Sequence, residues 1–182
     1  MAGTALEGMA MKGGVDSTLT EGVADTKYAI PNMRVDVHHP KVGVPVLWWR
    51  SVGHTHTAYV METMIDELAR IAGKDPVAYR MALLEGHPRH QGVLKLAAEK
   101  AGWGKPLPPG RFRGVAVHES FSSYVAEVAE IAVDAKGGFK VERVWAAVDC
   151  GVAVNPDIVR AQMEGGIGYG LSAALGEAIT LE

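Results

Sequence analysis

The sequence is poor in cysteine, in long apolar runs and in charge of one sign, and each absence excludes a class of site. Cys150 is the single cysteine among 182 residues, so this chain by itself forms neither a disulfide framework nor a cysteine-ligated zinc or iron–sulfur site. No apolar run approaches the roughly 20 residues of a membrane helix. With 18 basic and 21 acidic residues, the chain lacks the basic face that nucleic acid binding requires.

What remains is typical of a globular domain, with 48% hydrophobic and 21% charged residues. The length fits one domain or two small lobes. Residues 1–20 are rich in glycine and show no period, so we expect a loose N-terminal segment followed by the main domain over residues 21–182. The first residues do not resemble a secretory signal. The chain as given is therefore expected in the cytoplasm, although the sequence leaves the compartment open.

Helical spacing dominates residues 57–104. From about Thr57 to Gly73 an amphipathic helix is expected, with Glu62, Asp66 and Arg70 on its polar face. Its apolar residues are Met61, Met64, Ile65, Leu68, Ile71 and Ala72. Asp75-Pro76 predicts the start of a second helix that runs to Leu84. A third helix should end at Gly102.

Strand patterns occur on both sides of this helical part. Asn32 to His38 alternates and predicts a half-buried strand, and Val44 to Trp49 is a second short apolar run. Residues 111–182 should form a mainly antiparallel sheet, with a hairpin at Lys136-Gly137-Gly138. Asn155-Pro156 then starts a glycine-rich helix that reaches about Leu175 and backs the sheet. The fold class is therefore predicted to be α+β.

The last helix carries four glycines between Gly165 and Gly170. Each costs a helix roughly 1 kcal/mol relative to alanine, so something should come close to this backbone. Either a cofactor lies against it, or another helix or sheet packs there, and spacing alone leaves both open. The glycines match neither a dinucleotide fingerprint nor a phosphate-binding loop.

Arg50-Ser51-Val52-Gly53 places a guanidinium and a hydroxyl just before a helix, whose free N–H groups favour anions. A surface arginine stacked on a tryptophan is the simpler interpretation. His54-Thr55-His56 has no carboxylate or thiol at metal-ligand spacing, so no metal site is expected. Cys150 or Ser120 as a hydrolase nucleophile stays a third, less favoured alternative.

Ten motifs in order resemble one family: the large, molybdopterin-binding subunit of isoquinoline 1-oxidoreductase and related bacterial aldehyde dehydrogenases, of the xanthine oxidase class. The resemblance covers about Glu21 to the end. The motifs are Glu21-Gly22, Tyr28–Asn32, Trp49–Gly53, Glu62 with Ile65–Ala69, Asp75-Pro76 with Arg80, Ala101–Gly104, Ala126–Glu130, Asp149–Gly151, Asn155-Pro156 and Gln162–Gly166.

This resemblance implies a molybdenum hydroxylase that oxidises an aldehyde or an N-heterocycle. In the family, molybdenum is held by molybdopterin, usually as a cytosine dinucleotide in bacteria. A molybdenum hydroxide attacks the substrate carbon and hydride passes to a sulfide. Electrons leave through a small subunit with two [2Fe-2S] clusters. Relatives can be periplasmic or membrane-associated.

Carried over to this chain, the resemblance makes Arg50 a charge-stabilising catalytic residue. Ser51, Val52 and Gly53 would bind the cofactor, together with Gln162, Gly165 and Gly166. The family's general base lies in a downstream Gly-x-Gly-Glu motif that this sequence lacks, and Glu164 stands in a different motif. We therefore expect an internal fragment that needs the remainder of the large subunit, retains no cofactor alone and self-associates through exposed sheet edges. A non-catalytic scaffold or split-subunit partner is the alternative.

Overall fold

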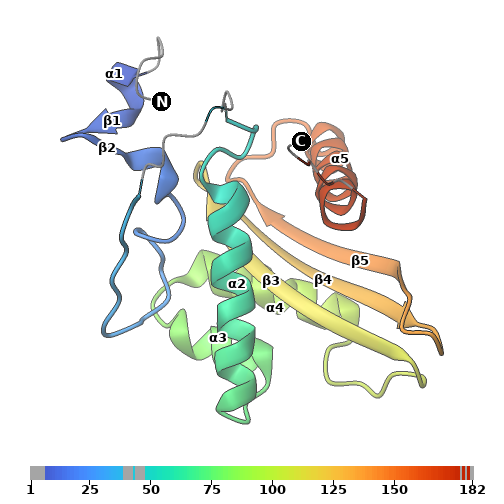
Figure 1. Cartoon of the computed structure of the whole chain (residues 1–182). Coiled ribbons are helices and arrows are strands. Elements are labelled where there is room, and N and C mark those ends of the chain that lie inside the picture. Colours follow the sequence, from blue (N-terminus) through green and yellow to red (C-terminus); the bar gives the residue numbers. More distant parts are fainter. Residues whose placement is uncertain (1–6, 39–42, 44–47, 177, 179, 181–182) are drawn as a thin grey trace. The chain divides into compact units, whose positions relative to one another are not determined.

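The computed structural model describes residues 7–38, 43, 48–176, 178 and 180 (Figure 1). The chain divides into two compact units, Met1–Asp149 and Cys150–Glu182. Helices and a three-stranded antiparallel sheet confirm the α+β fold class. Within the described residues, none of the helices combines the length and apolarity needed to span a membrane.

Three consecutive helices confirm the predicted helical part of the first unit. They are α2 (His54–Ile71), α3 (Pro76–Leu83) and α4 (Pro88–Ala101). The Asp75 carboxylate accepts a hydrogen bond from the Ala78 N–H at 2.8 Å, which caps α3. At the end of α4, Gly102 takes the left-handed conformation (φ +64°) that most often follows a helix.

The sheet has the order β3-β4-β5, formed by β3 (Arg111–Ser120), β4 (Ser123–Val133) and β5 (Phe139–Asp149). Both pairs are antiparallel, and the register of β4 against β5 shifts at Glu130/Ile131. The second turn contains Gly137 at φ +83°, so the predicted hairpin at Lys136-Gly137-Gly138 is confirmed.

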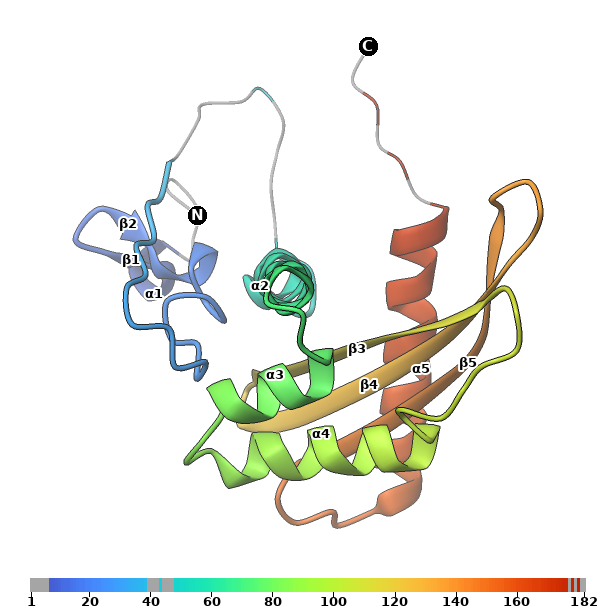
Figure 2. The same ribbon diagram turned by 90° about the horizontal axis from the view of Figure 1, so that it is seen from below.

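Helix α4 covers one face of this sheet (Figures 1 and 2). Leu94 and Ala97 of α4 lie in the same buried cluster as Val117 and Val128 of the sheet. Helix α2 crosses near β3, and α3 lies between α2 and α4 (Figure 2). The core of the first unit is therefore a sheet with its apolar face closed by helices, as burial of apolar surface favours.

One prediction from pattern is wrong in this part. Residues 32–38 form no strand: Met33 is 42% exposed and Arg34 binds Asp36, two residues further on. Alternation produces a strand only where a neighbouring strand pairs with it, and none is described beside this segment. The apolar run 44–47 lies outside the described residues.

The predicted faces of α2 are confirmed only in part: Met61 and Ile65 are buried as expected. Leu68, Met64 and Ile71 are exposed, whereas the acidic Glu62 is buried. The reason is a buried partner for Glu62 on α3, described below.

Short elements precede this core: α1 (Glu7–Ala10), β1 (Met11–Lys12), β2 (Val15–Asp16) and the 3-10 helix η1 (Ser17–Leu19). In the second unit, α5 (Pro156–Leu175) begins at the predicted Asn155-Pro156. The Asn155 side chain accepts hydrogen bonds from the N–H groups of Asp157 and Ile158. All twenty residues of α5 are described and none is buried.

Candidate functional site

The predicted arginine loop, Trp49–Gly53, is a tight turn that leads directly into α2. The Val52 N–H donates to the Trp49 carbonyl oxygen at 3.0 Å. Val52 has φ +52°, a conformation that a β-branched residue rarely adopts. Such strain costs about 1–3 kcal/mol and persists only where the surroundings impose it. Arg50 and Ser51 are exposed at the tip of this turn.

The surroundings that impose this turn come from the segment Thr18–Gly22. A Cβ on Gly53 would lie 1.7 Å from the Thr18 carbonyl oxygen, so no other residue fits there without moving the backbone. The Trp48 indole N–H donates to the Thr18 hydroxyl at 3.1 Å. The Thr57 hydroxyl lies 2.6 Å from the carbonyl oxygen of Glu21. The arginine loop is thus fixed against a segment more than 30 residues earlier.

A groove of about 260 Å³ opens beside the arginine loop. Its lining includes Leu19, Trp48, Trp49, Val52, Gly53 and His56. Ser51 turns its hydroxyl to that of Thr55, 2.5 Å away on the first turn of α2. An exposed guanidinium and hydroxyl beside a groove at a helix N-terminus suit an anionic group.

The side chains of His54 and His56, which alternate in the sequence, do not form a pair in the structure. His54 joins His118 of β3 instead of His56, with Nδ1 and Nε2 2.8 Å apart. Burial lowers the pKa of His118 to about 4, and the neighbouring His54 adds to the effect. Among residues 7–38, 43, 48–176, 178 and 180, no group of three or more His, Cys, Asp or Glu side chains is arranged to hold a metal ion.

A buried charged network, which sequence reasoning missed, lies between α2, α3 and β3. The Arg80 Nε donates to the Glu62 carboxylate at 2.9 Å, and the Tyr28 hydroxyl donates to its other oxygen at 2.7 Å. Burial raises the pKa of Glu62, while its bonds from Arg80, Tyr28 and the Val117 N–H oppose that rise. Because these bonds join α2 to α3 and β3 in the interior, the network serves the fold.

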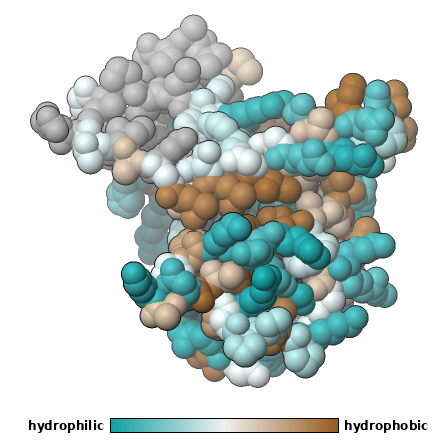
Figure 3. Space-filling view, turned by 90° about the vertical axis from the view of Figure 1, so that its right-hand side faces the viewer, coloured by the Kyte–Doolittle hydropathy of each residue, from teal (hydrophilic) through white to brown (hydrophobic). Residues whose placement is uncertain are grey.

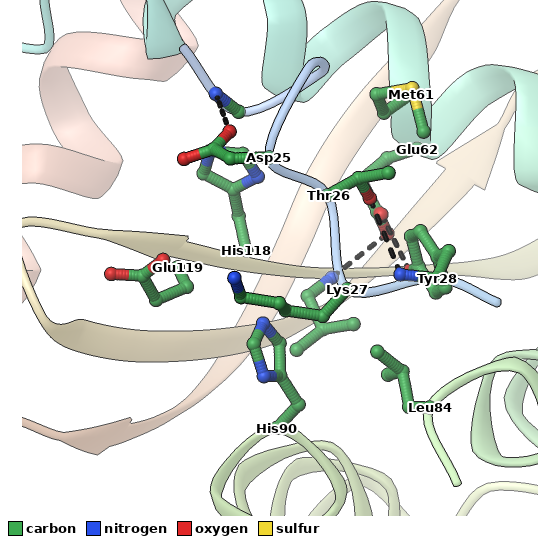
Figure 4. Close-up of a pocket in the computed structure, with 12 residues that line it drawn as sticks. Asp25, Thr26, Lys27, Tyr28, Met61, Glu62, Leu84, His90, His118 and Glu119 are labelled. Atoms are coloured by element: carbon green, nitrogen blue, oxygen red, sulfur yellow. Dashed lines mark hydrogen bonds between the residues drawn. The ribbon is translucent and has the colours of Figure 1, made fainter. Parts of the chain in front are cut away.

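A small cavity lies next to this network (Figure 4). It measures about 20 Å³, which is room for about one water molecule. His118, His90 and Glu119 line one side of it, and Tyr28 and Glu62 line the other. A space of this size does not admit an aldehyde or heterocyclic substrate.

The other predicted cofactor residues lie on α5, in the second unit. Gln162, Gly165 and Gly166 are exposed and, at spacings of three and four, share one helix face. Among the described residues nothing lies within 4 Å of a Cβ placed on Gly165 or Gly166. The predicted site residues therefore form two sets, one in each unit. Cys150, at the start of the second unit, is partly buried.

Two family profiles match this chain, and both describe a molybdopterin cofactor-binding domain. One covers residues 9–84 and the other residues 58–182. The first match contains the arginine loop. The second contains the face of α5 that carries Gln162, Gly165 and Gly166, which we call the glycine face. The overlap falls on α2 and α3, the helices joined by Glu62 and Arg80.

Three curated relatives are similar over most of this chain. The beta chain of isoquinoline 1-oxidoreductase from Brevundimonas diminuta is 36% identical over 84% of this chain, which is 20% of that protein. A nicotinate dehydrogenase subunit from Pseudomonas putida is 34% identical over 85% of this chain and 14% of its own length. A membrane-bound aldehyde dehydrogenase [pyrroloquinoline-quinone] of Gluconacetobacter polyoxogenes is 32% identical over 71% and 19%, respectively.

The chain thus spans a fifth or less of the length of these curated relatives. The family profiles, in contrast, account for it from residue 9 to residue 182. The resemblance seen in the ordered motifs is thereby confirmed, and the chain belongs to the family of molybdopterin cofactor-binding domains.

Proposed function

We propose that this chain is part of the cofactor-binding subunit of a molybdenum hydroxylase, with residues 21–182 as a partial molybdopterin-binding domain. The observation that carries the proposal is the match of both family profiles, one over the arginine loop and one over the glycine face of α5. The substrate class would be an aldehyde or an N-heterocycle. The relatives named for isoquinoline and nicotinate represent the second class, and the one named for aldehydes represents the first.

The residues present fit an anionic pterin cofactor at two places. At the arginine loop, exposed Arg50 and Ser51 stand at the N-terminus of an 18-residue helix, where positive potential favours anionic groups. On α5, the bare backbone at Gly165 and Gly166 leaves space for a flat ring that a Cβ would displace. We assign cofactor binding to Ser51, Val52, Gly53, Gln162, Gly165 and Gly166.

When bound, the cofactor supplies the centre that accepts electrons from the substrate. The role proposed for Arg50 is electrostatic. Its guanidinium stabilises negative charge that develops on the substrate or on the cofactor. The strained turn at Val52 holds the backbone that carries this side chain, so the charge is positioned before substrate arrives.

The remaining parts are proposed to lie outside this chain. The general base and the rest of the cofactor cradle would come from other segments of the large subunit, and electrons would leave through a small [2Fe-2S] subunit. The cofactor would be the cytosine dinucleotide form. On this proposal the isolated chain retains no molybdenum and does not turn over.

Elemental analysis for molybdenum tests the proposal. The chain is purified alone and again after co-expression with the rest of the large subunit and the small subunit. We expect metal only in the assembled protein, and a loss of turnover per molybdenum in Arg50→Gln. Arg34→Gln is the matched control, because Arg34 is also exposed but pairs with Asp36 and is not among the residues that line the groove beside the arginine loop.

Two outcomes would contradict the proposal. Stoichiometric molybdenum in the chain alone would show that the cradle is complete without other segments. An assembled protein that holds no metal would favour the second function, a scaffold or split-subunit partner without catalysis. The small share of each relative that the chain spans is the observation that keeps this second function in view.

A further inference from the structure

The Thr57 hydroxyl occupies an unusual place behind the arginine loop. It lies 2.6 Å from the Glu21 carbonyl oxygen and 3.0 Å from the Gly53 carbonyl oxygen. The side chain is 4% exposed, so no solvent replaces this hydroxyl if it is removed. One buried hydroxyl thus joins the end of the arginine loop to a segment 36 residues earlier in the chain.

The backbone around this hydroxyl is tightly packed. A Cβ on Gly22 would lie 2.7 Å from the Thr57 hydroxyl oxygen and 2.9 Å from His54 Nδ1. Gly22 also has φ +80°, where other residues are strained. Together with the close approach of Gly53 to Thr18, these contacts make the Thr18–Gly22 segment a rigid support on which the loop rests.

Arg50 is three residues from Gly53, and the strained Val52 stands between them. A turn held at φ +52° by its surroundings relaxes when one of those surroundings is lost. The Thr55 hydroxyl donates to the Val52 carbonyl at 2.8 Å, but that bond is local to the turn and does not fix it to the rest of the unit. Several contacts connect the loop to the Thr18–Gly22 segment: the Trp48 indole bond to Thr18, the Gly53 N–H bond to the Glu21 carboxylate at 3.4 Å and the approach of His56 to the Leu19 carbonyl oxygen at 3.3 Å. The contact of the Thr57 hydroxyl, at 2.6 Å, is the shortest of them.

We propose that Thr57 is a positioning residue, whose hydroxyl fixes the arginine loop to the Thr18–Gly22 segment and thereby sets where Arg50 acts. The inference rests on the proposed function, since it concerns the same site. It adds to that function a specific group, the Thr57 hydroxyl, that does not touch substrate and through which the segment around Glu21 influences turnover.

The test uses the assembled enzyme with Thr57→Val, which removes the hydroxyl and keeps the shape. Turnover per bound molybdenum is expected to fall by about tenfold, and Thr57→Ser should restore most of it. Thr63→Val is the matched control on the same helix. Thr63 also bonds the carbonyl four residues before it, Tyr59, at 2.8 Å, but is exposed, and its loss should leave turnover unchanged.

Two further measurements separate positioning from folding. In an Arg50→Gln background, Thr57→Val should cause little additional loss, because residues that act through one another are not additive. In cofactor-free assembled protein, trypsin should cut after Arg50 several-fold faster in Thr57→Val than in Thr63→Val. If Thr57→Val does not accumulate, Trp48→Phe, which removes the bond to Thr18, should give the same faster cleavage.

The outcomes are distinguishable from failure of the proposed function. An assembled wild-type enzyme without molybdenum contradicts the proposed function itself. A wild-type enzyme that holds molybdenum, with Thr57→Val matching Thr63→Val in turnover and in cleavage, overturns the positioning role. A loss that Thr57→Ser does not restore, or that adds fully to Arg50→Gln, also overturns it.

Discussion

The two glycines behind the arginine loop and the glycines of α5 have opposite surroundings. In the first unit, Cβ atoms on Gly22 and Gly53 would collide with neighbours at 2.7 Å and 1.7 Å. In the second unit, nothing among the described residues lies within 4 Å of a Cβ on Gly165, Gly166, Gly168 or Gly170. Packing within the first unit explains Gly22 and Gly53, whereas the glycines of α5 carry a helix cost with no described occupant beside them.

The two units also differ in whether they have a buried core. The first unit buries Ile65, Leu94 and Val128 completely, although it leaves other large apolar side chains such as Ile71 exposed. Helix α5 has no buried residue, and its Ile158 and Tyr169 are 60% and 58% exposed. Apolar atoms also reach the surface on the face seen in Figure 3. The first unit has a buried core and should therefore fold by its own interactions. Exposed apolar patches on a helix usually meet a partner, so the second unit should depend on what covers it. Self-association of the isolated chain is the expected consequence.

The largest effect on the first unit should come from Arg80→Met. The substitution leaves the buried Glu62 carboxylate without its main partner, and breaking one side of a buried ion pair costs about 3–5 kcal/mol. Urea unfolding of the purified chain measures the loss. Arg70→Met is the control, since Arg70 pairs with Glu67 on the surface and such exposed pairs contribute little to stability. Equal losses for both variants would mean that the network does not stabilise the first unit.

Gly53→Ala should destabilise the first unit by about 2–3 kcal/mol, the cost of overpacking a tight site. The new methyl group meets the Thr18 backbone, which cannot move aside as a flexible side chain would. Gly92→Ala within α4 provides the comparison, because nothing lies within 4 Å of its Cβ position. That control should gain stability, and a neutral Gly53→Ala would show that the contact with Thr18 is looser than the structure has it.

Acid should weaken the first unit in a definite pH window. Burial holds the pKa of His118 at about 4, below its ordinary value of 6.5, so the unfolded chain binds this proton first. The stability is complete above about pH 6.5 and is lost as the pH falls from 6.5 toward 4.

His118→Gln should flatten this dependence, measured as unfolding midpoint against pH, and exposed His56→Gln should not. The groups that face His118 are His54, Glu119, Asp25 and His90. His90 has a lowered pKa of its own, so some slope should remain in His118→Gln. An unchanged profile would place the acid sensitivity elsewhere.

The starts of α3 and α5 were predicted from the sequence because a helix cap depends on residues that are neighbours in the chain. Asp75-Pro76 and Asn155-Pro156 each gave a helix start with the expected side-chain cap. A strand at 32–38 was predicted wrongly because alternation says nothing about whether a second strand lies alongside.

The contacts behind the arginine loop could not be predicted from spacing, because their partners are distant in sequence. Thr57 meets Glu21 across 36 residues, and Arg80 meets Glu62 across 18. A glutamate on a helix is ordinarily exposed, and its buried partners, Arg80 foremost, reverse that expectation. The motifs that contain Glu21, Glu62 and Arg80 indicated a resemblance to the family, but they did not reveal these contacts.

The smallest effect on stability should come from Gly165→Ala. This substitution tests whether the glycines of α5 serve a partner that the isolated chain lacks. In the isolated chain the substitution meets no described neighbour, so it should stabilise the helix by roughly 0.5–1 kcal/mol. In the assembled enzyme the same methyl group should occupy the space proposed for the cofactor and lower the molybdenum content. Ala161→Gly, one turn earlier on α5, is the reverse control and should weaken the helix without affecting metal. If Gly165→Ala stabilises the helix and leaves molybdenum unchanged, the glycine face serves contact with another helix or sheet, because only such packing, and not the cofactor, would then need the bare backbone.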